Sequence, residues 1–330
     1  MKTPIILLTN EKGGVGKTTT AVNLASEFAQ RGRKVLLIDA DFQANATNQI
    51  GAGERAAGSG KYFAKAVAEQ APFMNYVVES NIPNIQVLAG SQELKNAYRQ
   101  FAGKPRETHM FKAVLFPDDS RAELESRYDI VIIDTHPIVD QIVLSAGAIA
   151  TGYIVPVFPE GPSVDGLTWL IREIKEAGFQ NPHLTLYGVL IGNHMPKNAT
   201  YMKMIDQIRS FPQQIEGVRV FQTIIPHSAS VAASNTMRMT ALEYGGSKQL
   251  TSAFAILADE VWAIAEEHLR LINDRTAAAA AEPSITPALI EEIPELGLNS
   301  VATVSATDNQ AGTSRDDQRQ IIVIEEDVID

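Results

Sequence analysis

Two lysines and three glycines lie close together near the start of the chain, in the stretch NEKGGVGKTTT at residues 10–20. Glycines at positions 13, 14 and 16 let backbone N–H groups turn toward an anion, because glycine adopts conformations that other residues avoid. Lys17 adds a cation, and Thr18 adds a hydroxyl where a helical pattern begins. A loop with these groups in this order can bind phosphate together with Mg²⁺.

The loop departs from the common phosphate-binding pattern G-x-x-x-x-G-K-[ST] at its first position, where Glu11 replaces glycine. It matches the pattern x-K-G-G-x-G-K-T, which contains a second lysine, Lys12. A chance glycine turn before a helix is the alternative interpretation. The loop residues that we expect to bind a nucleotide are Lys12, Gly13, Gly14, Val15, Gly16, Lys17, Thr18 and Thr19.

The elements that would position this loop alternate along the chain between short β-branched runs and helical patterns. Strands are predicted at residues 4–9, 34–39, 84–89, 128–134, 152–158, 184–192 and 218–225. Nearly continuous apolar strands separated by helices are typical of a parallel sheet covered on both faces. The sequence therefore predicts a doubly wound, mostly parallel α/β domain, in which ligands bind beyond the carboxyl ends of the strands.

Several ordered motifs resemble one family, the ParA/MinD family of deviant Walker A ATPases, and the resemblance covers most of residues 3–272. The phosphate loop is similar to the deviant Walker A loop. KVLLIDADFQANAT at 34–47 resembles the second strand and switch I, usually D-x-D-P-Q-x-x-x-T, with Phe42 in place of proline. YDIVIIDTHP at 128–137 resembles the Walker B strand and switch II, with His136 where proline is usual. VPVFPEGPSVDGLTWL at 155–170 and GVLIGN at 188–193 resemble later segments.

The resemblance implies ATP and Mg²⁺ as cofactors, ATP hydrolysis as the activity, and roles for individual residues. Thr18, Asp134 through water, and Asp39 would hold Mg²⁺. Asp41 would position the attacking water, with Asp39 supporting it. Lys12 would reach across an ATP-dependent homodimer to the partner's phosphates, so that hydrolysis requires dimerisation. Asn193 and Pro226 would lie at the adenine. The alternatives are carboxylates that cap a strand or a turn, a loop-capping Asn193 and a solvated Lys12.

Composition restricts the function classes. Cysteine is absent, which excludes disulfides and Cys-ligated metal clusters, and the six histidines are scattered singly. The net charge is −11, but residues 274–330 hold twelve acidic and three basic residues, which leaves 27 acidic and 25 basic residues before them. Low aromatic content and net negative charge in that segment are typical of disorder. We therefore expect an ATPase domain at 1–273 and an acidic, disordered tail at 274–330.

Three function classes compete for such an ATPase. The first is DNA partition, in which an ATP dimer binds duplex DNA non-specifically on the nucleoid and a ParB-like centromere-binding protein stimulates hydrolysis. Residues 193–250 favour it, with six basic residues against three acidic ones. A solvated face of mixed charge is the alternative. The DNA-binding candidates are, in order of preference, Arg238, Lys248, Lys203 and Arg209.

The second class is a MinD-like membrane switch, which needs a basic amphipathic C-terminal helix. This chain ends IIVIEEDVID, which an anionic membrane would repel, so we expect no membrane partner. The third is an amide-forming ligase, which generally lacks a lysine like Lys12, or a metal-cluster carrier, which needs cysteine. A ParA-like ATPase that positions conjugation machinery or another cargo stays open. The short apolar run after Lys2 does not fit a signal peptide, which favours the cytoplasm.

Overall fold

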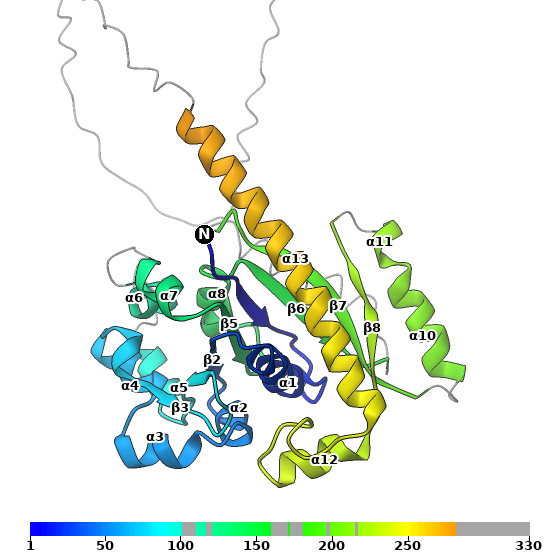
Figure 1. Cartoon of the computed structure of the whole chain (residues 1–330), viewed down its shortest axis with the longest axis horizontal. Coiled ribbons are helices and arrows are strands. Elements are labelled where there is room, and N and C mark those ends of the chain that lie inside the picture. Colours follow the sequence, from blue (N-terminus) through cyan, green and yellow to red (C-terminus); the bar gives the residue numbers. More distant parts are fainter. Residues whose placement is uncertain are drawn as a thin grey trace, which may run out of the picture. The chain divides into compact units, whose positions relative to one another are not determined.

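The computed structural model of the chain describes residues 1–100, 110–116, 121–159, 171, 181–195, 199–214 and 217–281. These residues form a sheet of eight strands in the order β3-β4-β2-β5-β1-β6-β7-β8, shown in Figure 1. The strands are β1 (Ile5–Leu8), β2 (Val35–Ala40), β3 (Val77–Glu79), β4 (Ile85–Leu88), β5 (Ile130–Thr135), β6 (Gly152–Val157), β7 (Thr185–His194) and β8 (Val220–Pro226). All neighbouring pairs are parallel except β3 with β4.

Helices pack on both faces of this sheet. They are α1 (Lys17–Gln30), α2 (Asn45–Gln49), α3 (Gly53–Ser59), α4 (Phe63–Glu69), α5 (Leu94–Arg99), α6 (Met110–Leu115), α7 (Ala122–Arg127), α8 (Gln141–Gly147), α10 (Ala199–Arg209), α11 (Phe211–Gln214), α12 (Ala229–Thr236) and α13 (Lys248–Ala281), with a 3₁₀ turn at Phe73–Asn75. Alternate residues of β1 pack into the hydrophobic cores on the two opposite faces of the sheet. Ile6 and Leu8 pack with α1 and α13, whereas Ile5 and Leu7 pack with the helices of the other face. Because both faces are covered, β1 is buried throughout.

All seven predicted strands are present, and the doubly wound, mostly parallel architecture is confirmed. The prediction missed β3, an edge strand of three residues with only Val78 buried. It also ended the strand that becomes β7 two residues too early. Backbone pairing of His194 with Pro226 extends β7 past Asn193, which we had placed after the strand.

The long helix α13 packs against α1 and β8. It continues to Ala281, and the compact unit that contains it spans Met1–Glu282. The boundary predicted at residue 273 therefore falls inside a helix. Among the residues whose burial the structure describes, Ile272 is the last buried one, and residues 273–278 of the helix are exposed. Residues 273–278 of α13 thus lie on the solvent side of the packed core.

Candidate nucleotide site

The phosphate loop connects the carboxyl end of β1 to the first residue of α1. Gly14 and Gly16 have φ angles of 74° and 88°, in the left-handed region that glycine enters without strain. A side chain at Gly16 would also meet the Phe158 ring at 3.4 Å. These two glycines turn the chain so that α1 begins at Lys17, and its first N–H groups face the space beyond the sheet. Helix N-termini of this kind favour anions.

The two lysines of the loop have opposite environments. Lys17 is buried, and its Nζ donates hydrogen bonds to the carbonyls of Asn10 at 2.8 Å and Lys12 at 3.1 Å. Burial lowers the pKa of Lys17, while Asp134 and Asp41 act in the opposite direction. Lys12 is exposed, and its backbone N–H donates to the Asn10 side chain at 2.9 Å. The loop therefore holds one lysine in place and presents the other to the surface.

Asp134 ends the apolar run of β5 and is fully buried. Among the described residues, neither of its carboxylate oxygens has a hydrogen-bond partner. Burial and the neighbouring Asp39, its register partner on β2, raise the pKa of Asp134 well above the usual value. The Thr18 hydroxyl and Lys17 ammonium favour the ionised form and oppose that rise. A fully buried carboxylate at the carboxyl end of a strand, next to a hydroxyl at a helix start, fits a magnesium site.

Asp39 organises the loop that follows β2. Its Oδ2 accepts hydrogen bonds from the backbone N–H and the hydroxyl of Thr47, both at 2.7 Å, and its Oδ1 accepts from the Asp41 N–H at 3.1 Å. Burial raises the pKa of Asp39 to about 6, and these donors limit the rise. Gly90 approaches the same turn so closely that a side chain there would meet Asp39 at 2.8 Å. These contacts position Asp41, while a metal role for Asp39 stays a prediction.

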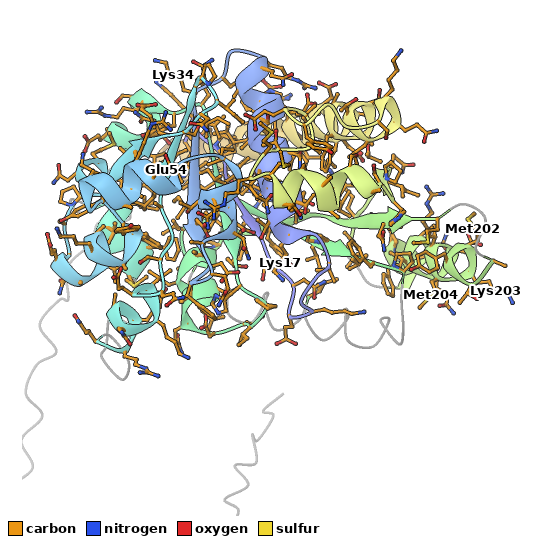
Figure 2. The ribbon with its side chains drawn as sticks, turned by 90° about the horizontal axis from the view of Figure 1, so that it is seen from below. Lys17, Lys34, Glu54, Met202, Lys203 and Met204 are labelled. Carbon is orange, nitrogen blue, oxygen red and sulfur yellow. The ribbon has the colours of Figure 1, made fainter. Side chains whose placement is uncertain are left out.

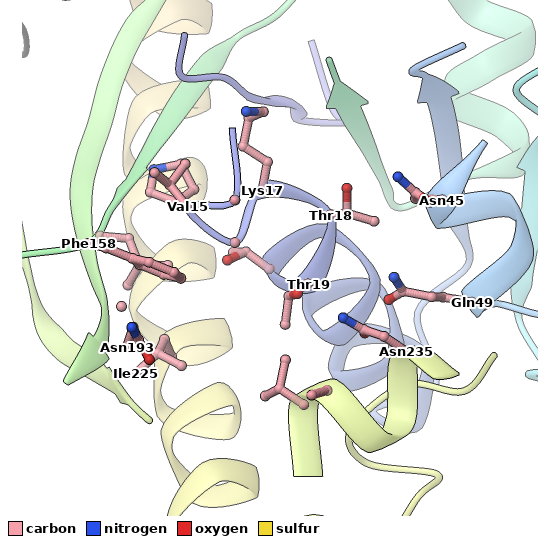
Figure 3. A pocket seen from close by; sticks show the side chains of 18 of the residues that line it. Val15, Lys17, Thr18, Thr19, Asn45, Gln49, Phe158, Asn193, Ile225 and Asn235 are labelled. Atoms are coloured by element: carbon pink, nitrogen blue, oxygen red, sulfur yellow. The ribbon is translucent and has the colours of Figure 1, made fainter. Parts of the chain in front are cut away.

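A cavity of about 780 Å³ opens beside the phosphate loop. Its walls come from the loop and α1, from Asp41 and α2, and from the carboxyl ends of β6, β7 and β8. Figure 3 shows Phe158, Asn193 and Ile225 on one side of the start of α1, and Asn45 and Gln49 on the other. The predicted adenine residues Asn193 and Pro226 both line this cavity. Asn193 has a φ of 55°, and its Oδ1 lies 2.6 Å from His227 Nδ1.

The four predicted DNA-binding residues are exposed but lie on different elements. Lys203 and Arg209 are on α10, beside the edge strand β8, and Figure 2 shows Lys203 at the periphery, well away from Lys17. Lys248 is the first residue of α13. Arg238 follows α12, has a φ of 55° and lines the nucleotide cavity. Arg238 is thus placed near the nucleotide as well as at the surface.

Sequence reasoning gave no role to three residues that shape the site. Asn10 bridges the loop to β6, because its Nδ2 donates to the Pro156 carbonyl at 2.7 Å. Phe158 lies against Gly16 at the carboxyl end of β6. Thr47 fixes Asp39, as described above. The signal that could have revealed Phe158 is its place just after a buried parallel strand, where ligand sites gather.

The residues described by the structure include no group of three or more histidines or carboxylates arranged to hold a metal ion. An Mg²⁺ ion here would take most of its ligands from water and phosphate oxygens, as Mg²⁺ commonly does. Asp134 and Thr18 fit that role. Within the described part of the chain, no helix is both long and apolar enough to cross a membrane.

Comparisons with known proteins agree with this geometry. A family model described as an AAA domain, AAA_31, matches residues 3–186. The chromosome-partitioning ATPase Soj of Thermus thermophilus is 31% identical over 265 residues, which cover 79% of this chain and 96% of that protein. The chromosome partitioning protein ParA of Caulobacter vibrioides is 28% identical over 258 residues, which cover 78% and 93%.

The fold is shared with cobyrinic acid a,c-diamide synthase from Mycobacterium smegmatis, solved with bound ADP and magnesium. The TM-score is 0.64 at 21% identity, over 78% of this chain and 93% of that one. At this identity the likeness concerns the fold alone. The family model matches more than half of the chain, and the two relatives match along nearly their full length. These matches show the family as well as the fold. The chain belongs to the AAA_31 family and is a P-loop ATPase of the ParA/MinD group.

Proposed function

We propose that this ATPase partitions DNA. In this proposal it dimerises with ATP, the dimer binds duplex DNA on the nucleoid without sequence preference, and a centromere-binding partner of the ParB kind stimulates hydrolysis and release. The observation that carries the proposal is the match to chromosome-partitioning proteins over 93–96% of their own lengths. A match of 258–265 residues is longer than the family match at residues 3–186, so it also includes residues beyond 186.

The loop supports ATP chemistry of this kind. Lys17 would neutralise the β- and γ-phosphates, and two of its three N–H groups already bond to the loop itself, which fixes its position. Asp41 would orient the attacking water. Mg²⁺, held by Thr18 and through water by Asp134, would neutralise charge on the phosphate oxygens. The exposed Lys12 would add a cation from the partner subunit, as an arginine finger does.

The DNA surface would come from cations of the C-terminal half. Lys203, Arg209, Arg238 and Lys248 are all exposed, and a dimer doubles their number. Because Arg238 lines the nucleotide cavity, its position would respond to nucleotide binding, which offers a physical route to ATP-dependent DNA binding. A monomer makes too few phosphate contacts to bind well.

The test is the affinity for two unrelated duplexes of equal length, measured by fluorescence anisotropy across a salt series with ATP, ADP or no nucleotide. If the dimer neutralises about four to six phosphates, log K falls against log salt with a slope of roughly −4 to −5. We expect this binding with ATP only, at similar affinity for both sequences. Binding that ignores the nucleotide, or none at low salt, would contradict the proposal.

Single variants locate the surface. Lys203→Ala and Lys248→Ala should each weaken binding to both duplexes and make the salt slope shallower by about one. Lys34→Ala is the matched control. Lys34 is an exposed cation that precedes β2, at the end of the sheet opposite the phosphate loop, so its removal should leave binding unchanged. An equal effect of Lys34→Ala would mean that only net charge matters.

A further inference from the structure

Two residues that differ from the family pattern contact each other in the structure. Phe42 stands at the usual proline position of switch I, and His136 stands at the usual proline position of switch II. Their ring centroids lie 5.3 Å apart with a tilt of 45° between the planes. This distance and tilt fall within the range of favourable aromatic contacts. The two loops are therefore joined by side chains at the positions where proline would otherwise stiffen each loop separately.

The pair lies directly behind the reacting end of the cavity. Asp41 and Gln43, on either side of Phe42, line the cavity. Thr135 and Pro137, on either side of His136, line it as well. Phe42 and His136 are not among its lining residues. The ring contact thus connects the backbone that carries Asp41 to the backbone that follows Asp134, without touching the nucleotide space.

His136 is anchored more firmly than Phe42. It is 1% exposed, and its Nε2 lies 3.0 Å from Asp140 Oδ2. The other oxygen of Asp140 accepts the backbone N–H of Ile142 at 2.9 Å and caps α8. Lys95 Nζ of α5 lies 5.9 Å from the centre of the half-buried Phe42 ring. A continuous set of contacts therefore runs from α8 through His136 to switch I.

We propose that Phe42 and His136 are positioning residues for ATP hydrolysis, and that their ring contact holds switch I against switch II so that Asp41 is aligned with the attacking water. Proline fixes φ within one loop. Phe42 and His136 leave φ free, and their contact supplies the missing constraint between the loops. The inference requires only the ATPase activity of the chain, so it stands or falls independently of DNA partition.

The decisive experiment is a double-mutant cycle with Phe42→Ala, His136→Ala and the double variant, measured as kcat and KM for ATP. Each single variant should lower kcat, and the double should be no slower than the slower single. Aromatic pairs of this kind are coupled by 0.5–1.5 kcal/mol, so the coupling factor in kcat should lie between about 2 and about 13. The KM for ATP should change less than kcat, because neither ring lines the cavity.

Further variants separate alignment from folding. His136→Phe keeps a ring but loses the bond to Asp140, so it should retain more activity than His136→Ala. Phe42→Pro combined with His136→Pro should recover turnover relative to the double alanine variant, because each proline stiffens its own loop. ATP-dependent dimerisation of each variant is measured by sedimentation, so that kcat is compared per dimer.

The matched control is His268→Ala. His268 contacts Tyr187 at 5.8 Å between ring centroids, which is also a histidine–aromatic contact, but on α13 and β7. Its removal should leave kcat unchanged in the folded protein. If the fold losses of kcat in Phe42→Ala and His136→Ala multiply in the double variant, the two residues act independently, and this result would overturn the proposal. Changes confined to KM, or an equal loss of kcat in His268→Ala, would overturn it as well.

Discussion

Lys12 and Lys17 are only five residues apart, but Lys12 is exposed and Lys17 is buried. Lys17 is buried and bonded to two carbonyls of its own loop, so its charge belongs to the site that the chain itself builds. Lys12 is exposed, although its backbone is fixed by Asn10. A rigid backbone with an exposed cation suits a contact to a second molecule, because little order is lost when that contact forms.

Replacement of Lys12 tests this difference. We expect Lys12→Ala to keep the fold and thermal stability, since surface substitutions usually change stability by less than about 0.5 kcal/mol. ATP-dependent dimerisation or hydrolysis should be lost, because in the proposed function Lys12 is the cation that reaches the partner's phosphates. Sedimentation with ATP in an Asp41→Ala background, where slow hydrolysis preserves the dimer, measures the first effect. A dimer and a turnover both equal to those of the parent chain would contradict a role across the interface.

The residue types of the site could be predicted from the sequence, but their partners could not. Asp39 and Asp134 each lie one residue before the carboxyl end of a buried strand, which indicates carboxylates at the ligand-binding edge of the sheet. Their placement as register partners depends on β2 pairing with β5, and Asp39 adds to the effect of burial in raising the pKa of Asp134. The contact of Phe42 with His136 joins residues almost a hundred positions apart. A single sequence carries no signal for such a contact.

At the scale of elements, a strand or helix could be predicted when its own residues carry the pattern that makes it form. Most of the seven predicted strands are buried along nearly their whole length, and such strands form continuous apolar runs that the sequence shows. β8, an edge strand with Gln222 exposed, was still predicted from its own β-branched and aromatic residues. β3 forms because β4 offers an edge, and its three residues carry no pattern of their own. The end of α13 was missed for a different reason. The run of alanines at 277–281 favours helix by intrinsic propensity, whereas the predicted boundary rests on low aromatic content and negative charge.

The packing of α13 against β7 predicts a pH dependence of stability. Burial lowers the pKa of His268 below its usual 6.5, and the charges of His183 and Arg275 lower it further. Below pH 6.5 the unfolded chain then binds more protons than the folded one. The free energy of unfolding should therefore fall as the pH drops through about 6.5. Urea unfolding of the nucleotide-free protein at a series of pH values measures this slope.

The variant His268→Leu should show a shallower slope over the same range, because it removes the group that resists protonation. The variant His227→Gln, which removes an exposed histidine outside this contact, is the control. If the free energy of unfolding falls equally with pH in the parent chain and in His268→Leu, a group other than His268 causes the loss of stability at acid pH.

At the scale of the whole molecule, the buried core of residues 1–278 ends within α13. Leu269 and Ile272 are the last buried side chains up to residue 278, and the Asn273 amide bonds to the Met1 carbonyl at 2.8 Å. Truncation after Asn273 should therefore lower the free energy of unfolding by no more than about 1 kcal/mol, because only exposed helix among the described residues is lost. Truncation after His268 removes both buried side chains and should cost roughly 2–5 kcal/mol for each. Thermal and urea unfolding of both products distinguish the two outcomes.

In the proposed function, the acidic C-terminal segment should weaken DNA binding by the rest of the chain. Residues 283–330 contain ten acidic and two basic residues, so truncation after Glu282 removes a net charge of −8 from the total of −11 and leaves α13 intact. A tethered anion competes with DNA phosphates for the same cations, and salt screens this competition. With ATP, the truncated chain should bind duplex DNA several-fold more tightly than the full chain at low salt. The two affinities should converge as the ionic strength approaches about 1 M, where the Debye length is about 3 Å.

A full-length variant with Glu291, Glu292 and Glu295 changed to glutamine separates the effect of charge from the effect of chain length, and it should bind with intermediate affinity. Equal affinities of the full and truncated chains at low salt would show that the acidic segment does not reach the DNA-binding surface.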